Sequence, residues 1–250
     1  MRPVFLTRVR FLGQTLSVAS EGIYVWPAFT LIKKASEIVE AQKAILRQTP
    51  VFFSSPSAVI AVAKGFTGEA IGPFYTVGRV SAEAIKTAFP KATVIYPDVA
   101  TAQSGHEALI ERLEALGYPK EILLVGATDA PFAVKETLTA KGVKVDTAGV
   151  YNRKPLELMQ KMREELELLI KKEPPVVFFT SRNAVDAFLE AIDVVQGARE
   201  WFIIGRAFAI HENIARHLVK IGFREVELAG DEAEMLRAIG ATKRSPSEKQ

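Results

Sequence analysis

The sequence predicts an α/β fold made of two similar domains, each with a parallel sheet covered by helices. Three observations support this prediction. Short apolar runs rich in valine, isoleucine and phenylalanine recur without polar alternation, as is typical of parallel strands buried on both faces. Stretches with helical periodicity lie between these runs, which indicates right-handed βαβ units. A motif from the first half of the chain also returns in the second half.

The expected strands and helices alternate along most of the chain. The strands are runs of β-branched and aromatic residues, such as Val-Phe-Phe at 51–53. We expect strands at 4–7, 23–26, 51–53, 74–77, 93–96, 122–125, 145–150, 176–180, 201–204 and 225–228. The intervening segments predict helices at 36–48, 81–88, 107–116, 132–141, 156–171 and 182–192.

The repeat is visible as two pairs of matching segments in the same order. Residues 51–59 (VFFSSPSAV) match residues 177–185 (VFFTSRNAV), and residues 74–79 (FYTVGR) match residues 201–206 (WFIIGR) at nearly the same separation. This separation is far longer than the ~20–50 residues of a solenoid repeat. It therefore predicts two copies of one α/β domain.

The second copy is complete only if the N-terminal strands belong to it. They would take the places that the strands at 122–125 and 145–150 hold in the first copy. Two chain crossings, near 27–32 and 150–155, would then form a hinge. We therefore expect a discontinuous domain A from 1–30 and 155–242, an inserted domain B at 31–154, and a flexible tail at 243–250.

Composition excludes several classes of function. The 250 residues include no cysteine, which excludes a disulfide framework, a thiolate nucleophile and a cysteine-ligated metal. The net charge of +3 is too mild to argue for a nucleic-acid partner. No apolar run approaches the ~20 residues of a membrane-spanning helix, and no stretch resembles a signal peptide, so we expect a cytoplasmic protein without a membrane partner.

Common catalytic and cofactor motifs are also missing from the sequence. There is no Gly-x-Gly-x-x-Gly after a strand, no phosphate loop and no Gly-x-Ser-x-Gly elbow. His106, His211 and His217 lack the spacing of metal ligands and are expected on solvated helix faces. We therefore expect neither a metal nor a nucleotide cofactor.

Arginines follow several of the expected strands. In an open parallel sheet, ligands bind beyond the carboxyl ends of the strands. A cleft lined by these arginines would attract a polyanion, although arginines at strand ends are also common on plain surfaces. The six are Arg8, Arg10, Arg79, Arg153, Arg182 and Arg206.

Hydroxyl-bearing residues and glycines occupy the same kind of position. Ser54, Ser55, Thr180 and Ser181 lie between a strand and a helix, where they could cap the helix or leave its N–H groups to bind carboxylate or phosphate. Gly78 and Gly205 would permit a tight turn or the close approach of a ligand. Tyr151 ends an apolar run at the second chain crossing. Its hydroxyl could face a cleft, or its ring could pack in the hinge.

An ordered set of short motifs resembles the uroporphyrinogen-III synthase family. The set covers nearly the whole chain, although each motif is short. It comprises Phe-Leu-Thr-Arg at 5–8, residues 53–59, 75–82, 96–97 and 104–109, 138–145, Val-Tyr-Asn-Arg at 150–153, residues 179–185 and 204–205.

The resemblance implies flavodoxin-like domains joined by a two-stranded linker, with the substrate in the cleft between them. It implies a cofactor-free hydro-lyase of haem biosynthesis, acting as a monomer, that closes hydroxymethylbilane to uroporphyrinogen III. Water leaves to give an azafulvenium cation, and a spiro intermediate inverts the last pyrrole. Tyr151 aligns with the tyrosine that protonates the departing hydroxyl group. The residues implied to bind the substrate are Arg8, Ser54, Ser55, Gly78, Arg79, Ser81, Ser104, Arg153, Thr180, Ser181, Gly205 and Arg206.

Two departures from the family pattern leave other functions open. Phe208 stands where relatives often have threonine, and residues 126–130 read Gly-Ala-Thr-Asp-Ala where relatives often carry an Arg-Gly-rich loop. We expect both positions to face the cleft. One alternative is therefore a weakly active or inactive relative that closes on a small polyanion without a catalytic acid. Another is an α/β enzyme that acts on a sugar phosphate or a nucleotide.

Overall fold

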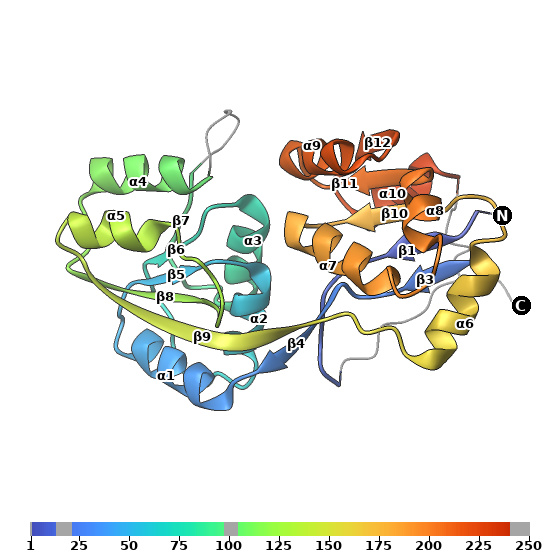
Figure 1. Ribbon diagram of the computed structural model, residues 1–250. Coiled ribbons are helices and arrows are strands. Elements are labelled where there is room, and N and C mark those ends of the chain that lie inside the picture. Colours follow the sequence, from blue (N-terminus) through green and yellow to red (C-terminus); the bar gives the residue numbers. More distant parts are fainter. Residues whose placement is uncertain (1, 14–21, 98–104, 241–250) are drawn as a thin grey trace, which may run out of the picture. The chain divides into compact units, whose positions relative to one another are not determined.

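The computed structural model describes residues 2–13, 22–97 and 105–240, and contacts divide the chain into two compact units. The central unit is Ile32–Arg153, and the terminal unit combines Met1–Leu31 with Lys154–Gln250. Each unit has a parallel sheet with helices packed against it (Figure 1). Among the described helices, none is long and apolar enough to cross a membrane.

The sheet of the central unit is parallel from β9 to β7. Its middle strand β5 (Val51–Phe53) is buried at every residue, as expected for a strand covered on both faces. The other strands are β6 (Phe74–Tyr75), β7 (Val94–Ile95), β8 (Glu121–Ala127) and β9 (Lys144–Pro155). The helices are α1 (Ala35–Leu46), α2 (Pro56–Ala63), α3 (Arg79–Ala88), α4 (Gly105–Leu116) and α5 (Val134–Ala140).

Each face of this sheet has its own core. On one face, Phe53, Phe74 and Phe89 meet edge to face or stacked, with ring centroids 5.3–6.3 Å apart. On the other, Phe52 packs with leucines of α4 and α5. Adjacent side chains of β5 therefore enter different cores, because successive residues of a strand point to opposite faces.

The terminal unit has a five-stranded, wholly parallel sheet. Phe5 lies at the centre of an aromatic core and is fully buried, with ring centroids of Trp26 and Phe202 at 5.1 and 4.8 Å. The strands are β1 (Val4–Leu6), β3 (Ile23–Val25), β10 (Val176–Phe179), β11 (Arg206–Ala209) and β12 (Glu225–Leu228). The helices are α6 (Gln160–Leu169), α7 (Arg182–Ile192), α8 (Ala198–Ile203), α9 (Glu212–Ile221) and α10 (Glu232–Ala238).

The two sheets share one spatial arrangement but follow a different chain order. The central sheet runs β9-β8-β5-β6-β7, and the terminal sheet runs β3-β1-β10-β11-β12. The N-terminal strands β1 and β3, blue in Figure 1, thus lie beside the orange β10, where β8 and β9 lie beside β5 in the central unit. The fold is a duplicated α/β domain in which one copy is circularly permuted across the chain.

A two-stranded segment joins the units. It consists of β4 (Phe29–Lys33) and the second half of β9. The Lys34 amide donates to the Val150 carbonyl at 3.0 Å, and the Leu156 amide donates to the Ala28 carbonyl at 2.9 Å, which is an antiparallel pairing. The short strand β2 (Arg10–Phe11) pairs with β4.

The expected strand at 201–204 is wrong. These residues belong to helix α8 and the turn after it, and the strand is β11, which begins at Arg206. Trp201 and Phe202 are buried against Phe5 from the helix, and the Trp201 indole donates to the Lys172 carbonyl at 3.2 Å. A short apolar run can be a strand or the buried face of a helix, and periodicity alone does not separate them.

The sequence match between residues 74–79 and residues 201–206 therefore does not join structurally equivalent segments. The partner of β6 in the terminal unit is β11, not the segment at 201–204. Gly78 is the N-cap residue of α3, and the residue in the same position after β11 is His211, the N-cap residue of α9. Gly205 instead precedes β11.

Candidate functional site

The candidate site of the central unit lies where its strand connections change direction. The chain leaves β5 towards β6 on one side of the sheet and leaves β8 towards β9 on the other. The carboxyl ends of β5 and β8 therefore border the crevice in which open parallel sheets bind ligands. Ser54 and Ser55 follow β5, and Thr128 and Asp129 follow β8.

Tyr151 is brought to this edge by an irregularity in β9. Gly126 lies opposite Gly149, but Ala127 lies opposite Tyr151, so Val150 is an extra residue in β9. A bulge of this kind changes the direction in which the following side chain points. The Thr128 amide then donates to the Tyr151 carbonyl at 2.9 Å, which ties the bulged strand to the end of β8.

Two glycines allow the strands to meet at this bulge. A Cβ on Gly149 would lie 2.7 Å from the Cα of Thr128. A Cβ on Gly126 would collide with the Ser54 hydroxyl group. Both glycines thus serve close packing of the chain around the site. The first part of the 126–130 segment is buried strand, and only its end, at Thr128 and Asp129, is exposed.

The Tyr151 hydroxyl group meets the Ser55 hydroxyl group. The two oxygens are 3.1 Å apart, and the tyrosine is 5% exposed. Ser55 is also the N-cap residue of α2, because its Oγ accepts a hydrogen bond from the Ala58 amide at 3.2 Å. The predicted site residues Ser54, Ser55 and Tyr151 thus lie at one edge of the central sheet.

The environment of Tyr151 shifts the pKa of its phenol. Burial raises the pKa of Tyr151 above its ordinary value, because a buried phenolate loses hydration. The hydrogen bond to Ser55 and the charge of Arg153 lower the pKa, and Asp129 raises it. The net shift is upward, so Tyr151 is a neutral acid with a proton to give at neutral pH.

Arg153 and Asp129 form an ion pair beside the tyrosine. The Arg153 Nε donates to Asp129 Oδ1 at 3.0 Å, and a second guanidinium nitrogen lies 2.9 Å from the same oxygen. The arginine is mostly buried, whereas the aspartate side chain is 64% exposed. The expected anion-binding Arg153 is therefore at the site and is partnered by a carboxylate of the chain.

The predicted site residues Gly78, Arg79 and Ser81 lie at the start of α3. Arg79 is the first residue of this helix, its side chain is 80% exposed, and its Nε lies 3.7 Å from Glu83 Oε1. Gly78 has an extended backbone, and a Cβ there would meet nothing, so neither a tight turn nor the chain itself requires glycine. Ser81 is buried on the inner face of the helix.

The terminal unit has a corresponding edge between β1 and β10. Thr7 is fully buried, and its hydroxyl group donates to the Phe178 carbonyl at 2.7 Å. Ser181 caps α7 by accepting from the Ala184 amide at 3.1 Å, and Thr180 precedes it. Arg8 lies 3.0 Å from Glu232.

Two further arginines that were expected at strand ends, Arg182 and Arg10, are exposed. Arg182 is the exposed first residue of α7. Arg10 is exposed in β2, next to the joining segment, rather than after a strand of a main sheet.

Two predicted site residues lie at the wrong end of their strand. Gly205 and Arg206 were expected after a strand, but they stand at the amino end of β11, where Arg206 is opposite Val176, the first residue of β10. A Cβ on Gly205 would collide with the Pro175 carbonyl, which explains the glycine by packing. The Arg206 Nε and Nη2 donate to the two carboxylate oxygens of Glu227, at 2.6 and 2.8 Å. Gly205 and Arg206 were expected to bind the substrate because they were thought to follow a strand. They do not follow one, so we no longer place them at the substrate.

Phe208 is also corrected. It was expected to face a cleft, but it is 1% exposed in the middle of β11 and packs in the second core of the terminal unit. Its departure from the family pattern is thus a matter of core packing. Ser104 lies outside the described residues.

Sequence reasoning missed several groups at these edges. Thr128 and Asp129 belong to the 126–130 segment that was expected to face the cleft, but they were not among the expected substrate contacts, and they lie beside Tyr151. His211 caps α9, its Nδ1 accepting from the Asn213 amide at 3.1 Å, and the equivalence with Gly78 could have been found once β11 was assigned correctly. Glu232 pairs with Arg8 across more than two hundred residues of sequence, which no local signal reveals.

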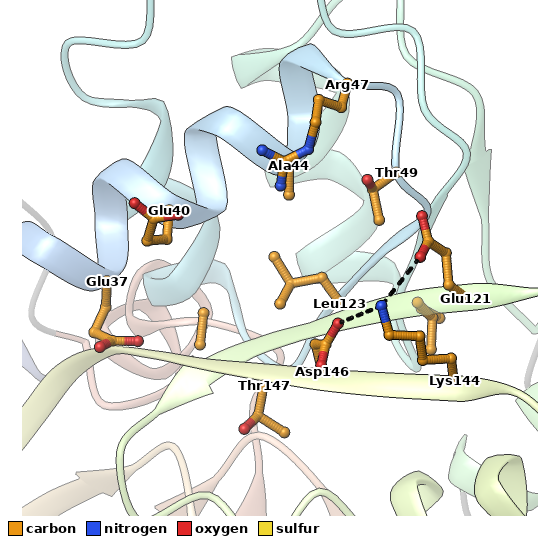
Figure 2. A pocket seen from close by; sticks show the side chains of 12 residues that line it. Glu37, Glu40, Ala44, Arg47, Thr49, Glu121, Leu123, Lys144, Asp146 and Thr147 are labelled. Atoms are coloured by element: carbon orange, nitrogen blue, oxygen red, sulfur yellow. Dashed lines mark ion pairs between the residues drawn. The ribbon is translucent and has the colours of Figure 1, made fainter.

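A groove of about 450 Å³ lies at the opposite end of the central sheet (Figure 2). It is bordered by α1 and the first residues of β8 and β9, and none of the predicted site residues lines it. Lys144 lies 3.7 Å from both Glu121 and Asp146, as the dashed lines show. The groove is therefore separate from the carboxyl edge that carries Tyr151.

Comparison with known proteins identifies the family. A family model described as uroporphyrinogen-III synthase HemD matches residues 18–239. The crystal structure of uroporphyrinogen-III synthetase from Helicobacter pylori has a TM-score of 0.60 at 15% identity, covering 96% of this chain and 99% of that one. A mutant uroporphyrinogen III synthase from Thermus thermophilus has a TM-score of 0.54 at 18% identity, covering 94% and 97%. These structures share the fold, and no curated protein sequence matches significantly. Because the family model spans most of its length, the chain belongs to the uroporphyrinogen-III synthase family.

Proposed function

We propose that the carboxyl edges of both sheets bind hydroxymethylbilane and that Tyr151 is the acid in its closure to uroporphyrinogen III. Membership of the synthase family supports the reaction. The observation that carries the role of Tyr151 is its position, with a neutral hydroxyl group held at 3.1 Å from Ser55 beside the switch point of the central sheet. General acids of this kind contribute typically 10²–10⁴-fold to a rate.

The acid acts on the terminal hydroxymethyl group of the substrate. Tyr151 gives its proton to the hydroxyl oxygen, and the carbon–oxygen bond breaks. Water leaves, and the substrate remains as an azafulvenium cation. The substituted α-carbon of the last pyrrole attacks the methylene carbon of this cation and forms a spiro intermediate. The bond from that α-carbon to the neighbouring bridge carbon then breaks and leaves a second azafulvenium cation. The free α-carbon of the same pyrrole attacks the bridge carbon, which closes the macrocycle with the last ring inverted. Loss of one proton restores the aromatic pyrrole and balances the proton that Tyr151 supplied. The net change is the loss of one water molecule.

The carboxylates of the substrate suit the groups at these edges. The first amides of α2, α3 and α7 face the carboxyl side of the strands that precede them, and helix N-termini favour anions. α3 has no side-chain cap, and its Arg79 is largely exposed. Arg8 is paired with Glu232 and Arg153 with Asp129. On substrate binding, each arginine would leave its carboxylate partner and pair with a carboxylate of the substrate. The proposed contacts are Arg8, Ser54, Gly78, Arg79, Arg153, Thr180 and Ser181, with Ser55 acting through Tyr151.

The proposal includes no metal or other cofactor, because proton transfer from Tyr151 and the binding of carboxylates suffice for the steps above. We further propose that the protein is a monomer that acts in the cytoplasm. Analytical ultracentrifugation of the full chain tests the first point, since a concentration-independent mass of about 27.4 kDa is expected.

A coupled assay tests the proposed function. Hydroxymethylbilane is generated enzymatically, the protein is added, and the oxidised porphyrin isomers are separated by chromatography. We expect isomer III to replace isomer I, which forms by spontaneous closure. Isomer I alone, with a folded protein and verified substrate, would overturn the synthase proposal and favour the alternative of a relative that only binds a polyanion.

A further inference from the structure

Ser55 makes contacts that a helix cap alone does not need. Its Oγ lies 3.2 Å from the Ala58 amide and 3.1 Å from the Tyr151 hydroxyl oxygen. The equivalent serine of the terminal unit, Ser181, has the same contact with the Ala184 amide at 3.1 Å. That unit contains one tyrosine, Tyr24, which stacks on Phe5. The hydrogen bond between a helix-capping serine and a tyrosine hydroxyl group is therefore a feature of the central unit.

Either hydroxyl group can donate in this hydrogen bond, and the two directions have different consequences for the phenol proton. A backbone amide can only donate, so Ser55 Oγ accepts from Ala58. The serine hydroxyl keeps one proton, and the Tyr151 oxygen at 3.1 Å is within reach to accept it. When Ser55 donates, the phenol proton stays available for a substrate. When Tyr151 donates instead, that proton is already engaged.

We propose that Ser55 is a positioning residue that donates its hydroxyl proton to the Tyr151 oxygen and so directs the phenol proton to the substrate. This inference rests on the proposed role of Tyr151 as the acid. The bond strengthens when Tyr151 loses its proton, because hydrogen bonds to a charged acceptor are roughly twice as strong as those to a neutral one. Ser55 therefore stabilises the phenolate in the transition state more than the phenol in the ground state.

The start of α2 reinforces this effect. The Ala58 amide polarises the Ser55 hydroxyl group, which makes it a better donor, and hydrogen bonds in a chain strengthen one another. The partial positive charge at the N-terminus of the helix also favours a negative charge nearby. Pro56 at the first position of α2 carries no N–H group, so the amides that follow it set this end of the helix.

Arg153 and Asp129 also act on the Tyr151 pKa, but they do so through their charges. Arg153 favours the phenolate through its charge, but its guanidinium group is bound to Asp129. Asp129 itself opposes the phenolate. Ser55 is a neutral group, and its hydroxyl oxygen is in direct contact with the tyrosine oxygen.

Three substitutions separate positioning from capping. Ser55→Thr keeps both the cap and the donor. Ser55→Ala removes both. Ser55→Asp keeps a good cap but offers only an acceptor, so that Tyr151 would donate to the new carboxylate. A purely structural role predicts that Ser55→Asp is as active as the unchanged protein, whereas positioning predicts that it is the least active.

Activity is measured as kcat and KM for formation of isomer III. We expect kcat to fall about tenfold in Ser55→Ala and further in Ser55→Asp, with KM changed less, and Ser55→Thr to stay within about threefold. The thermal stability of Ser55→Ala is compared with that of Ser181→Ala, which removes a matched cap in the other unit.

A second measurement needs no substrate. The tyrosines are replaced by fluorotyrosine, and the ¹⁹F resonance of residue 151 is assigned by its absence from Tyr151→Phe. We expect the pKa of the fluorotyrosine to rise in Ser55→Ala, because the phenolate loses a donor, and to rise further in Ser55→Asp, because a like charge is added. Ser181→Ala should leave it unchanged.

The two readouts distinguish the possible failures. An active protein whose Ser55→Asp variant retains full kcat, or whose residue 151 titrates alike with serine and alanine at position 55, would overturn the role of Ser55 alone. A protein that makes no isomer III would overturn the proposed function, and with it any part that Ser55 plays in the reaction.

Discussion

At the scale of single residues, burial makes Tyr151 a weaker acid, and Ser55 and Arg153 offset part of this effect. An exposed phenol with an ordinary pKa near 10 is already neutral at pH 7, so burial is not needed to protonate it. Burial instead excludes water from the phenol and strengthens its interactions with Ser55 and Arg153. The result is an acid whose strength depends on a few fixed neighbours.

Removal of the Tyr151 hydroxyl group should impair the reaction without unfolding the protein. Tyr151→Phe is expected to lower kcat for isomer III by 10² to 10⁴, the typical range for a general acid. Tyr118→Phe is the matched control, because the Tyr118 hydroxyl group is buried in the same unit with no partner among the described residues. The control should keep the unchanged kcat. Equal losses in the two variants would contradict the role of Tyr151.

The pH dependence should respond to Asp129. Its charge raises the pKa of Tyr151, so Asp129→Asn should lower that pKa. Because Tyr151 acts in its protonated form, the alkaline limb of the kcat profile should move to lower pH. Asp146→Asn removes a carboxylate at the other end of β9, in the groove of Figure 2, and should leave the limb in place. An unmoved limb in Asp129→Asn would show that another group controls it.

At the scale of elements, the end of a strand decides which residues can reach a ligand. Ser55 and Ser181 follow β5 and β10 and cap the next helices in the same way. Gly205 and Arg206 share their local sequence with Gly78 and Arg79, yet they begin a strand instead of following one. The same short motif therefore has different roles at the two ends of a parallel strand.

Substitution of these two glycines should separate packing from ligand approach. Gly205→Ala is expected to lower the free energy of unfolding by about 1–3 kcal/mol, because the new Cβ collides with the Pro175 carbonyl. Gly78→Ser introduces a side chain where a Cβ meets nothing and adds a possible cap, so it should change stability by less than about 0.5 kcal/mol. Urea denaturation measures both. Equal stability of the two variants would contradict the packing argument.

At the scale of the whole molecule, the central unit is one continuous segment with its own core. Its ends are held side by side, since the Lys34 amide bonds to the Val150 carbonyl. The terminal unit is discontinuous, and its sheet needs β1 and β3 from the N-terminus. The central unit can thus be expressed as one continuous polypeptide, whereas the terminal unit consists of two separate segments of the chain.

The central unit should therefore fold when it is expressed alone. A polypeptide of residues 32–153 is expected to unfold cooperatively with a free energy of roughly 5 kcal/mol, at the lower end for small domains. The matched piece 154–240, which lacks β1 and β3, should not fold. Circular dichroism during urea denaturation compares the two. Cooperative unfolding of the second piece would show that the N-terminal strands are dispensable.

The sequence predicted the α/β class, parallel sheets and the duplication, because these depend on local patterns. Apolar runs such as 51–53 and 176–179 are buried on both faces, as their composition indicates. Ser55 and Ser181 each lie between a strand and a helix, and this local position is enough to predict that they are N-cap residues. The assignment of 201–204 failed because buried apolar residues are equally suited to a helix facing an aromatic core.

Only the tertiary structure determined which side chains meet. The bulge at Val150 depends on the pairing of β8 with β9, and the Ser55–Tyr151 contact joins residues 96 positions apart. Asp129 reaches Arg153 for the same reason. Burial patterns are carried by neighbouring residues and can be read along the chain, whereas contacts depend on register and strand order, which are set by the packing of the whole sheet.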